Sequence, residues 1–140
     1  MKVIGIDLDG TITPFGFCDL NIKFSLPWWL CCPLFLFFLL SKPKKAIVEK
    51  MRLMKDHGYR FIIVTRWPDQ FFRFIKRLLI FYGVPFDGLF CVGFDREANK
   101  RKLKIIKEKE MEAFIDSSKH VVEFLKRNSV NAVNTLEHFN

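Results

Sequence analysis

The sequence predicts an α/β fold, a Rossmann-like, doubly wound parallel sheet of about five strands with helices on both faces. Short β-favouring runs alternate with amphipathic helical stretches, which is the pattern of parallel strands joined by right-handed crossovers. Polar residues follow several of these runs directly, where an open α/β sheet places its chemistry. The 140 residues, of which 50% are hydrophobic, are enough for one compact core. We therefore expect one domain, residues 1–140, with a small apolar insertion at about 14–42.

The first strand is expected over residues 2–6, which favour β structure and run into Asp7, Asp9 and Gly10. Side chains alternate along an extended chain, so carboxylates two residues apart point to the same side. Close together and partly desolvated, they would repel each other unless one took a proton or a cation lay between them. Mg²⁺ suits oxygen ligands of this kind. The plainer alternative is that one carboxylate caps the next turn and the other is solvated.

Four helices and four further strands are expected to alternate after the insertion. Apolar residues at helical spacing indicate each helix, and Gly58 and Gly83 suit the ends of the first two. The narrow apolar stripe of the third is typical of a helix that lies on a sheet. The expected helices are 43–57, 69–82, about 98–110 and a last one that ends at 127. The expected strands are the short β-favouring runs 59–64, 89–92, 113–115 and 130–134.

Polar residues follow three of these strands. Asp7 and Asp9 follow the first, Thr65 ends the second, and Asp116 comes after the run 113–115. Because the carboxyl ends of parallel strands gather at one edge of the sheet, these residues can converge although they are far apart in sequence. Thr65 or Asp116 taken alone could simply cap the helix that follows it. The presence of all four at strand ends predicts a functional site.

These residues resemble the motifs of the haloacid dehalogenase-like (HAD) superfamily of aspartate-nucleophile phosphohydrolases. The first family motif, DxDGT, is matched by residues 7–11, and Thr13 completes its commonly extended form. The second motif, a Thr or Ser that ends the next core strand, is matched by Thr65. The resemblance covers nearly the whole chain, and the first motif is its specific part.

The third and fourth motifs are matched in the C-terminal half. A Lys near the start of the penultimate helix best matches Lys102, with Lys100 and Lys104 as rivals in the same Lys-rich stretch. Acidic residues that end the next strand are matched by Asp116. Many relatives have a second carboxylate there, whereas Ser117 follows here, so metal affinity is expected to be lower and Asp116 to carry more of it.

The resemblance implies a nearly capless, Mg²⁺-dependent phosphohydrolase that acts on a phosphate monoester through an aspartyl phosphate. Nucleotide, sugar, lipid and macromolecular phosphates all fit this chemistry. The implied residues are Asp7 as nucleophile, Asp9 as general acid and base, Thr65 and Lys102 as phosphoryl-holding groups, Gly10 and Thr11 as substrate contacts, and Asp7, the Asp9 backbone carbonyl and Asp116 as Mg²⁺ ligands. Arg66 is a further candidate contact for the substrate phosphate, and the plainer alternative is an ordinary surface residue.

A second unusual feature is the almost wholly apolar stretch 24–40, which lysines flank on both sides. It is shorter than the about 20 apolar residues of a spanning helix and contains prolines, so we expect no transmembrane helix. A lid over the site, a subunit interface, a peripheral membrane contact and a buried core segment all remain open interpretations. An exposed apolar surface of this size needs a partner, and we expect a homo-oligomer formed partly through residues 26–40.

The amino-acid composition indicates the cellular compartment and the partners that we expect. The cysteines lack zinc-ligand spacing and indicate small buried residues in a reducing compartment. Asp7 and Asp9 interrupt the apolar start, so no signal peptide is expected, and the expected location is the cytoplasm, with membrane association one of the open interpretations. The net charge of +8 would suit an anionic ligand, a nucleic acid or an anionic membrane surface, and charge alone does not choose among them. A nucleic-acid partner is not expected, because no RNA-binding signature accompanies the charge.

Two other classes of function remain in view. The first is a non-catalytic binding module that keeps the fold and uses residues 24–40. The second is a receiver-type phosphorylation switch, in which a later strand carries the phosphorylated Asp. No Asp ends the run 89–92 directly, which disfavours the switch.

Overall fold

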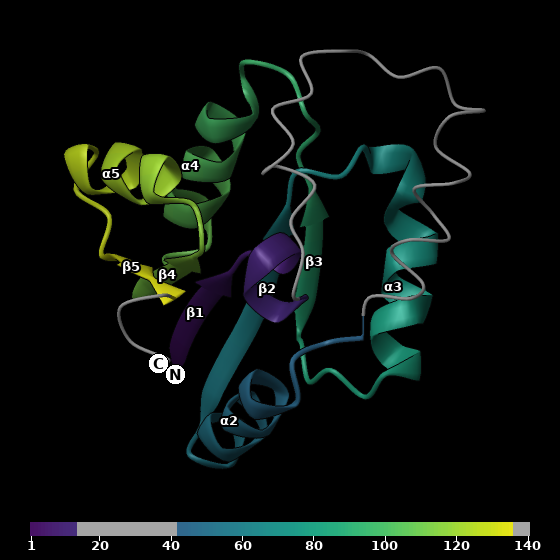
Figure 1. The fold of residues 1–140 in the computed structure, drawn as a ribbon. Coiled ribbons are helices and arrows are strands. Elements are labelled where there is room, and N and C mark those ends of the chain that lie inside the picture. Colours follow the sequence, from purple (N-terminus) through teal and green to yellow (C-terminus); the bar gives the residue numbers. More distant parts are fainter. Residues whose placement is uncertain (14–41, 136–140) are drawn as a thin grey trace.

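The computed structural model of the chain describes residues 1–13 and 42–135, and these form a five-stranded parallel sheet (Figure 1). Each neighbouring pair of strands is parallel. The spatial order is β3-β2-β1-β4-β5, which confirms the predicted Rossmann-like architecture. The strands are β1 (Lys2–Ile6), β2 (Tyr59–Thr65), β3 (Gly88–Cys91), β4 (Ala113–Asp116) and β5 (Ala132–Asn134).

Helices cover both faces of the sheet. They are α2 (Lys45–Asp56), α3 (Phe72–Phe81), α4 (Ala98–Glu108) and α5 (Lys119–Arg127). One buried cluster joins α2 and α3 to one face, and a second joins α4 and α5 to the other (Figure 1). Phe61 and Ile63 of β2 belong to the first cluster, whereas Val64 belongs to the second. This alternation is what a strand buried on both faces requires.

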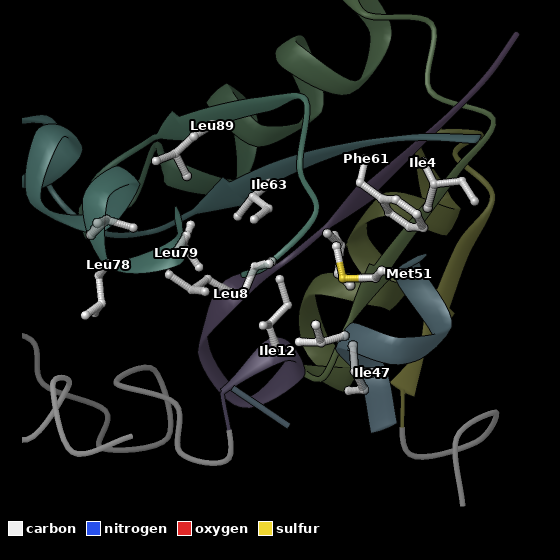
Figure 2. Packing of buried hydrophobic residues seen from close by; sticks show 14 of the residues in the cluster. Ile4, Leu8, Ile12, Ile47, Met51, Phe61, Ile63, Leu78, Leu79 and Leu89 are labelled. Carbon is white, nitrogen blue, oxygen red and sulfur yellow. The ribbon is translucent and has the colours of Figure 1, made fainter. Parts of the chain in front are cut away.

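The first cluster supports the chain beyond β1. Leu8 and Ile12 follow the strand and are fully buried among residues of α2 and of the sheet, including Ile47 and Met51 (Figure 2). Each buried aliphatic side chain of this kind contributes about 1.5 to 3 kcal/mol through loss of apolar surface from water. The turn that carries Asp9 is therefore anchored by apolar side chains on either side of it.

The strand boundaries differ from the expected ones by at most one residue, except at the start of β5. β5 begins at Ala132, later than the expected start at residue 130. The Val130 N–H donates instead to the Leu125 carbonyl at 3.0 Å and so completes the C-terminus of α5. The β-favouring side chain of Val130 indicates a strand, but its backbone N–H is engaged in the hydrogen bond that caps α5.

Residues 14–41 contain the expected insertion, the apolar stretch 24–40 and the expected subunit interface at 26–40, which all lie outside the described residues. Every helix named above packs on the one sheet. No helix in the described ranges is long and apolar enough to cross a membrane. The assignment of residues 1–140 to a single domain stays a prediction.

Candidate active site

The centre of the sheet brings Asp7 and Asp116 together. Strand order reverses at β1, which has β2 on one side and β4 on the other. The Asp7 backbone N–H donates to the Ile115 carbonyl at 2.9 Å, so the two aspartates leave the sheet at adjacent positions. Their exposed fractions are only 5% and 1%. Ligands of doubly wound sheets bind at such a switch point, outside the carboxyl ends of the strands.

Lys102 reaches both carboxylates from α4. Its Nζ lies 3.3 Å from Asp7 Oδ1 and 3.0 Å from Asp116 Oδ2, and the residue is 1% exposed. Ala98, Lys102 and Ile106 are the buried residues of this helix. Residues four apart share one helix face, so the helical period directs Lys102 toward the sheet.

The two rival lysines point elsewhere. Lys100 pairs with Glu97 and Lys104 with Glu108 along α4, and the lysine side chains are 72% and 74% exposed. Such surface pairs contribute about 0.2 to 1 kcal/mol at most. Of the three candidates, Lys102 is therefore the one that the structure brings to the carboxylates.

The cluster of Asp7, Asp116 and Lys102 contains two carboxyl groups and one ammonium group. Burial raises the pKa of Asp7 well above its usual range, and the nearby Asp116 charge raises it further, although Lys102 acts in the opposite direction. Burial alone would lower the pKa of Lys102, but the charges of Asp7 and Asp116 outweigh it and hold that pKa above its usual value. The lysine therefore stays protonated. One lysine does not offset the two buried carboxylates, and the cluster favours a further positive charge or a proton.

Asp9 lies in the tight turn Leu8–Ile12. Asp9 itself is extended and 4% exposed, and Gly10 follows with a φ of +75°, in the left-handed region that favours glycine. The Thr13 N–H closes the turn on the Leu8 carbonyl at 3.0 Å. The Lys44 Nζ donates to the Gly10 carbonyl at 3.3 Å. These bonds hold the turn that carries Asp9 at the same edge of the sheet as Asp7.

Sequence reasoning missed Trp67. Its indole Nε1–H donates to Asp9 Oδ1 at 3.1 Å, and the residue is 4% exposed. The available signal was its position just after Thr65, at the end of a strand that carries a motif residue. A single Trp after a strand has no specific chemical meaning, so this signal could have marked it only as a neighbour of the site.

Within residues 1–13 and 42–135, no hydrogen bond or ion pair joins Thr11, Thr65 or Arg66 to Asp7, Lys102 or Asp116. Thr65 is fully buried, and its Oγ1 accepts the Trp67 backbone N–H at 3.4 Å. Arg66 Nε and Thr11 Oγ1 are buried and have no hydrogen-bond partner in the described part of the chain. Buried polar atoms of this kind are suited to receive a polar ligand.

The oxygen donors of the site fit a Mg²⁺ ion. The carboxylates of Asp7 and Asp116 are adjacent, and the Ser117 hydroxyl donates to the Asp9 backbone carbonyl at 3.3 Å. Hard oxygen ligands are what Mg²⁺ prefers, and its charge would oppose the burial and the Asp116 charge that together raise the pKa of Asp7. Within the described ranges, no three His, Cys, Asp or Glu side chains form a metal-binding group. The ion would therefore depend on two carboxylates, a carbonyl and solvent.

Comparison with solved structures gives the fold a name. A chain of the Pnkp1/Rnl/Hen1 RNA repair complex matches 95% of this chain with a TM-score of 0.69 and 17% identity. The HAD domain of the effector protein Lem4 from Legionella pneumophila also matches 95%, with a TM-score of 0.58 and 16% identity. The chain has the fold of a HAD domain.

The two matches differ in how much of the other chain they cover. This chain spans 84% of the Lem4 HAD domain but only 42% of the RNA repair chain. No protein-family model and no curated protein sequence matches it. The HAD-like fold is thus shown by structure and agrees with the resemblance in the sequence motifs.

Proposed function

We propose that the chain is a Mg²⁺-dependent phosphohydrolase that cleaves a phosphate monoester through an aspartyl phosphate on Asp7. The observation that carries this proposal is the Lys102 ammonium group within 3.3 Å of Asp7 and 3.0 Å of Asp116 at the switch point of a HAD-like sheet. A buried ion cluster is a poor way to stabilise a fold. Its position at the ligand-binding edge favours a catalytic role.

In the first step, Asp7 attacks phosphorus and the bond between phosphorus and the leaving oxygen breaks. Asp9 gives its proton to that oxygen, so the leaving group departs as a neutral alcohol. A carboxylate can carry the phosphoryl group and thereby divides one difficult displacement into two easier ones. The hydrogen-bonded turn that holds Asp9 supports this role, because a general acid must be fixed close to the reacting atoms.

In the second step, water attacks the phosphorus of the aspartyl phosphate. Asp9, now a carboxylate, takes a proton from the water as the bond to the Asp7 oxygen breaks. Inorganic phosphate leaves, Asp7 is regenerated as a carboxylate, and Asp9 is again protonated for the next turnover. The same residue thus serves as acid and then as base.

Positive charge and hydrogen-bond donors would hold the phosphoryl group. Lys102 would orient Asp7 and neutralise phosphoryl oxygens. Arg66, with its buried Nε, is suited to bind a substrate oxygen, as are Thr11 and Thr65. When bound by Asp7, the Asp9 carbonyl and Asp116, Mg²⁺ supplies charge that offsets the repulsion between nucleophile and phosphate.

The strand order disfavours a receiver-type phosphorylation switch. Receiver domains have the order 2-1-3-4-5, whereas this sheet has the order 3-2-1-4-5. The strand β3 lies at the edge of the sheet and ends at Cys91, which is no phosphate acceptor of the receiver type. A non-catalytic binding module would use residues 24–40, which lie outside the described residues.

A phosphate-release screen with and without Mg²⁺ tests the proposal. It includes a nucleotide, a sugar phosphate, a lipid phosphate and a phosphopeptide, and also RNA with a terminal phosphate, because the similar Pnkp1 chain belongs to an RNA repair complex. We expect Mg²⁺-dependent release by the wild type and by Lys104→Met, whose lysine lies at the surface. Asp7→Asn should lose activity by roughly 10³-fold or more, as loss of a nucleophile does. Full activity of Asp7→Asn would overturn the mechanism.

The expected homo-oligomer is a separate part of the proposal. It would form partly through residues 26–40, whose apolar character needs a partner if the surface is exposed. Light scattering of the full chain should give at least the mass of a dimer. A monomeric mass would count against the interface.

A further inference from the structure

Trp67 lies beside the proposed acid and base although its own chemistry is unreactive. Its indole Nε1–H donates to Asp9 Oδ1 at 3.1 Å, and both residues are 4% exposed. An indole offers one N–H donor and no acceptor, so in this contact the carboxylate oxygen must be the acceptor. Burial strengthens such a bond relative to water. Trp67 therefore determines where one oxygen of Asp9 lies.

The indole ring is itself held from several directions. The Trp67 backbone N–H donates to Thr65 Oγ1 at 3.4 Å, and its carbonyl accepts the Gly93 N–H at 3.2 Å. Phe71 meets the ring edge-on at a centroid distance of 5.6 Å, and Phe94 lies at 6.1 Å. These contacts come from the chain segments that follow β2 and β3. The position of the N–H is therefore set by the sheet and its loops rather than by the carboxylate that it binds.

We infer that Trp67 is a positioning residue for Asp9, which holds Oδ1 so that Oδ2 exchanges the proton with the leaving group and with water. The inference rests on the proposed phosphohydrolase function. In the first step the Oδ2 proton passes to the leaving oxygen as its bond to phosphorus breaks. In the second step Oδ2 takes a proton from the attacking water. The Trp67 N–H donates to Oδ1 throughout and is neither lost nor gained.

Removal of the N–H should matter most when the leaving group needs a proton. Phenyl phosphate has such a leaving group, whereas 4-nitrophenyl phosphate releases a stable anion. Trp67→Phe keeps an aromatic ring and removes the donor. We expect kcat/KM for phenyl phosphate to fall about 10-fold to 100-fold, because this factor corresponds to the loss of one hydrogen bond to a charged group. We expect kcat/KM for 4-nitrophenyl phosphate to fall less than about 3-fold.

Two comparisons separate positioning from a general structural effect. Phe71→Leu removes the ring that packs edge-on against Trp67 but keeps the N–H donor, so it should lower kcat/KM for phenyl phosphate much less than Trp67→Phe does. In an Asp9→Asn background, Trp67→Phe should add nothing further with phenyl phosphate, because residues that act through one another are not additive. Equal slowing on both substrates by Trp67→Phe, or its full effect retained beside Asp9→Asn, would overturn the inference.

An NMR measurement tests the contact even if Trp67→Phe does not fold. In ¹⁵N-labelled protein, Asp9→Asn should shift the indole N–H resonance of Trp67, which is the one left over once Trp28→Phe and Trp29→Phe have assigned the other two. An unmoved Trp67 resonance would overturn the inference. Failure of the proposed function is recognised separately, because the wild type would then release no phosphate from either substrate.

Discussion

Lys102→Met tests how far the buried carboxylates depend on this lysine. Met keeps the length of the side chain and removes its charge, so Asp7 and Asp116, which are 5% and 1% exposed, lose the ammonium group at 3.3 and 3.0 Å. Removal of one partner from a buried ion pair costs about 3 to 5 kcal/mol. Burial already raises the pKa of Asp7, so proton uptake can relieve part of the cost. We expect the free energy of unfolding to fall by about 3 kcal/mol, the lower end of that range.

Urea denaturation at neutral pH in EDTA, followed by circular dichroism, measures this loss. Lys104→Met is the matched control on the same helix, since Lys104 pairs with the exposed Glu108 at 3.7 Å. Its loss should stay below about 0.5 kcal/mol, as for other exposed helical pairs. Addition of Mg²⁺ should restore part of the stability of Lys102→Met by ligand binding to the folded state. A Lys102→Met loss no larger than that of Lys104→Met would refute the account of the cluster.

Three further predictions concern stability and reactivity. The pKa of Asp7 is raised by burial and by Asp116, so in EDTA the stability of the wild type should fall as pH rises from about 4 through that raised pKa. Asp7→Asn should then be more stable than the wild type by about 1 to 2 kcal/mol at pH 7, a gain typical of single stabilising substitutions. Urea denaturation measured across pH should show this gain disappear near the usual pKa of Asp. A variant less stable than the wild type at pH 7 would contradict this reasoning. A Cβ on Gly5 would collide with the Phe114 ring and lie 2.5 Å from Met111 Sδ, so Gly5→Ala should lower the free energy of unfolding by about 1 to 3 kcal/mol, a loss that Phe114→Leu should partly relieve in the double variant. Burial, with the charges of Asp69 and Asp9, raises the pKa of Cys91 to about 12. In a variant whose other cysteines are replaced (Cys18→Ser, Cys31→Ser, Cys32→Ser), iodoacetamide at pH 8 should therefore modify the folded protein at least about 10-fold more slowly than the urea-unfolded protein. Equal rates would show that the thiol is accessible and ionises normally.

The sheet could be predicted from the sequence because each strand signal is local. A run such as 59–64 needs only its own β-branched and aromatic residues and the stop at Gly58 to indicate a strand. Parallel order then follows from the alternation with helices. The later start of β5 does not follow from a local signal, because the hydrogen bond from the Val130 N–H to the Leu125 carbonyl depends on how α5 ends, which a β-favouring side chain does not reveal.

The site was predictable where strand ends alone determine position. Asp7 and Asp116 meet because β1 and β4 are neighbours, and this follows from sheet topology. The choice of Lys102 among three lysines required the rotational phase of α4, which the buried residues Ala98 and Ile106 set. The contact between Trp67 and Asp9 joins positions 58 apart in the chain and depends on the turn after β1. No local pattern encodes such a geometry.

Identification of the phosphorylated residue tests the central claim, that Asp7 is the nucleophile, most directly. The protein is mixed with ³²P-labelled substrate and Mg²⁺, quenched in acid within one turnover, and digested for peptide mapping. We predict acid-stable, alkali-labile label on the peptide that contains Asp7, and none in Asp7→Asn. Label on another residue, or turnover by the wild type with no labelled peptide, would contradict the mechanism.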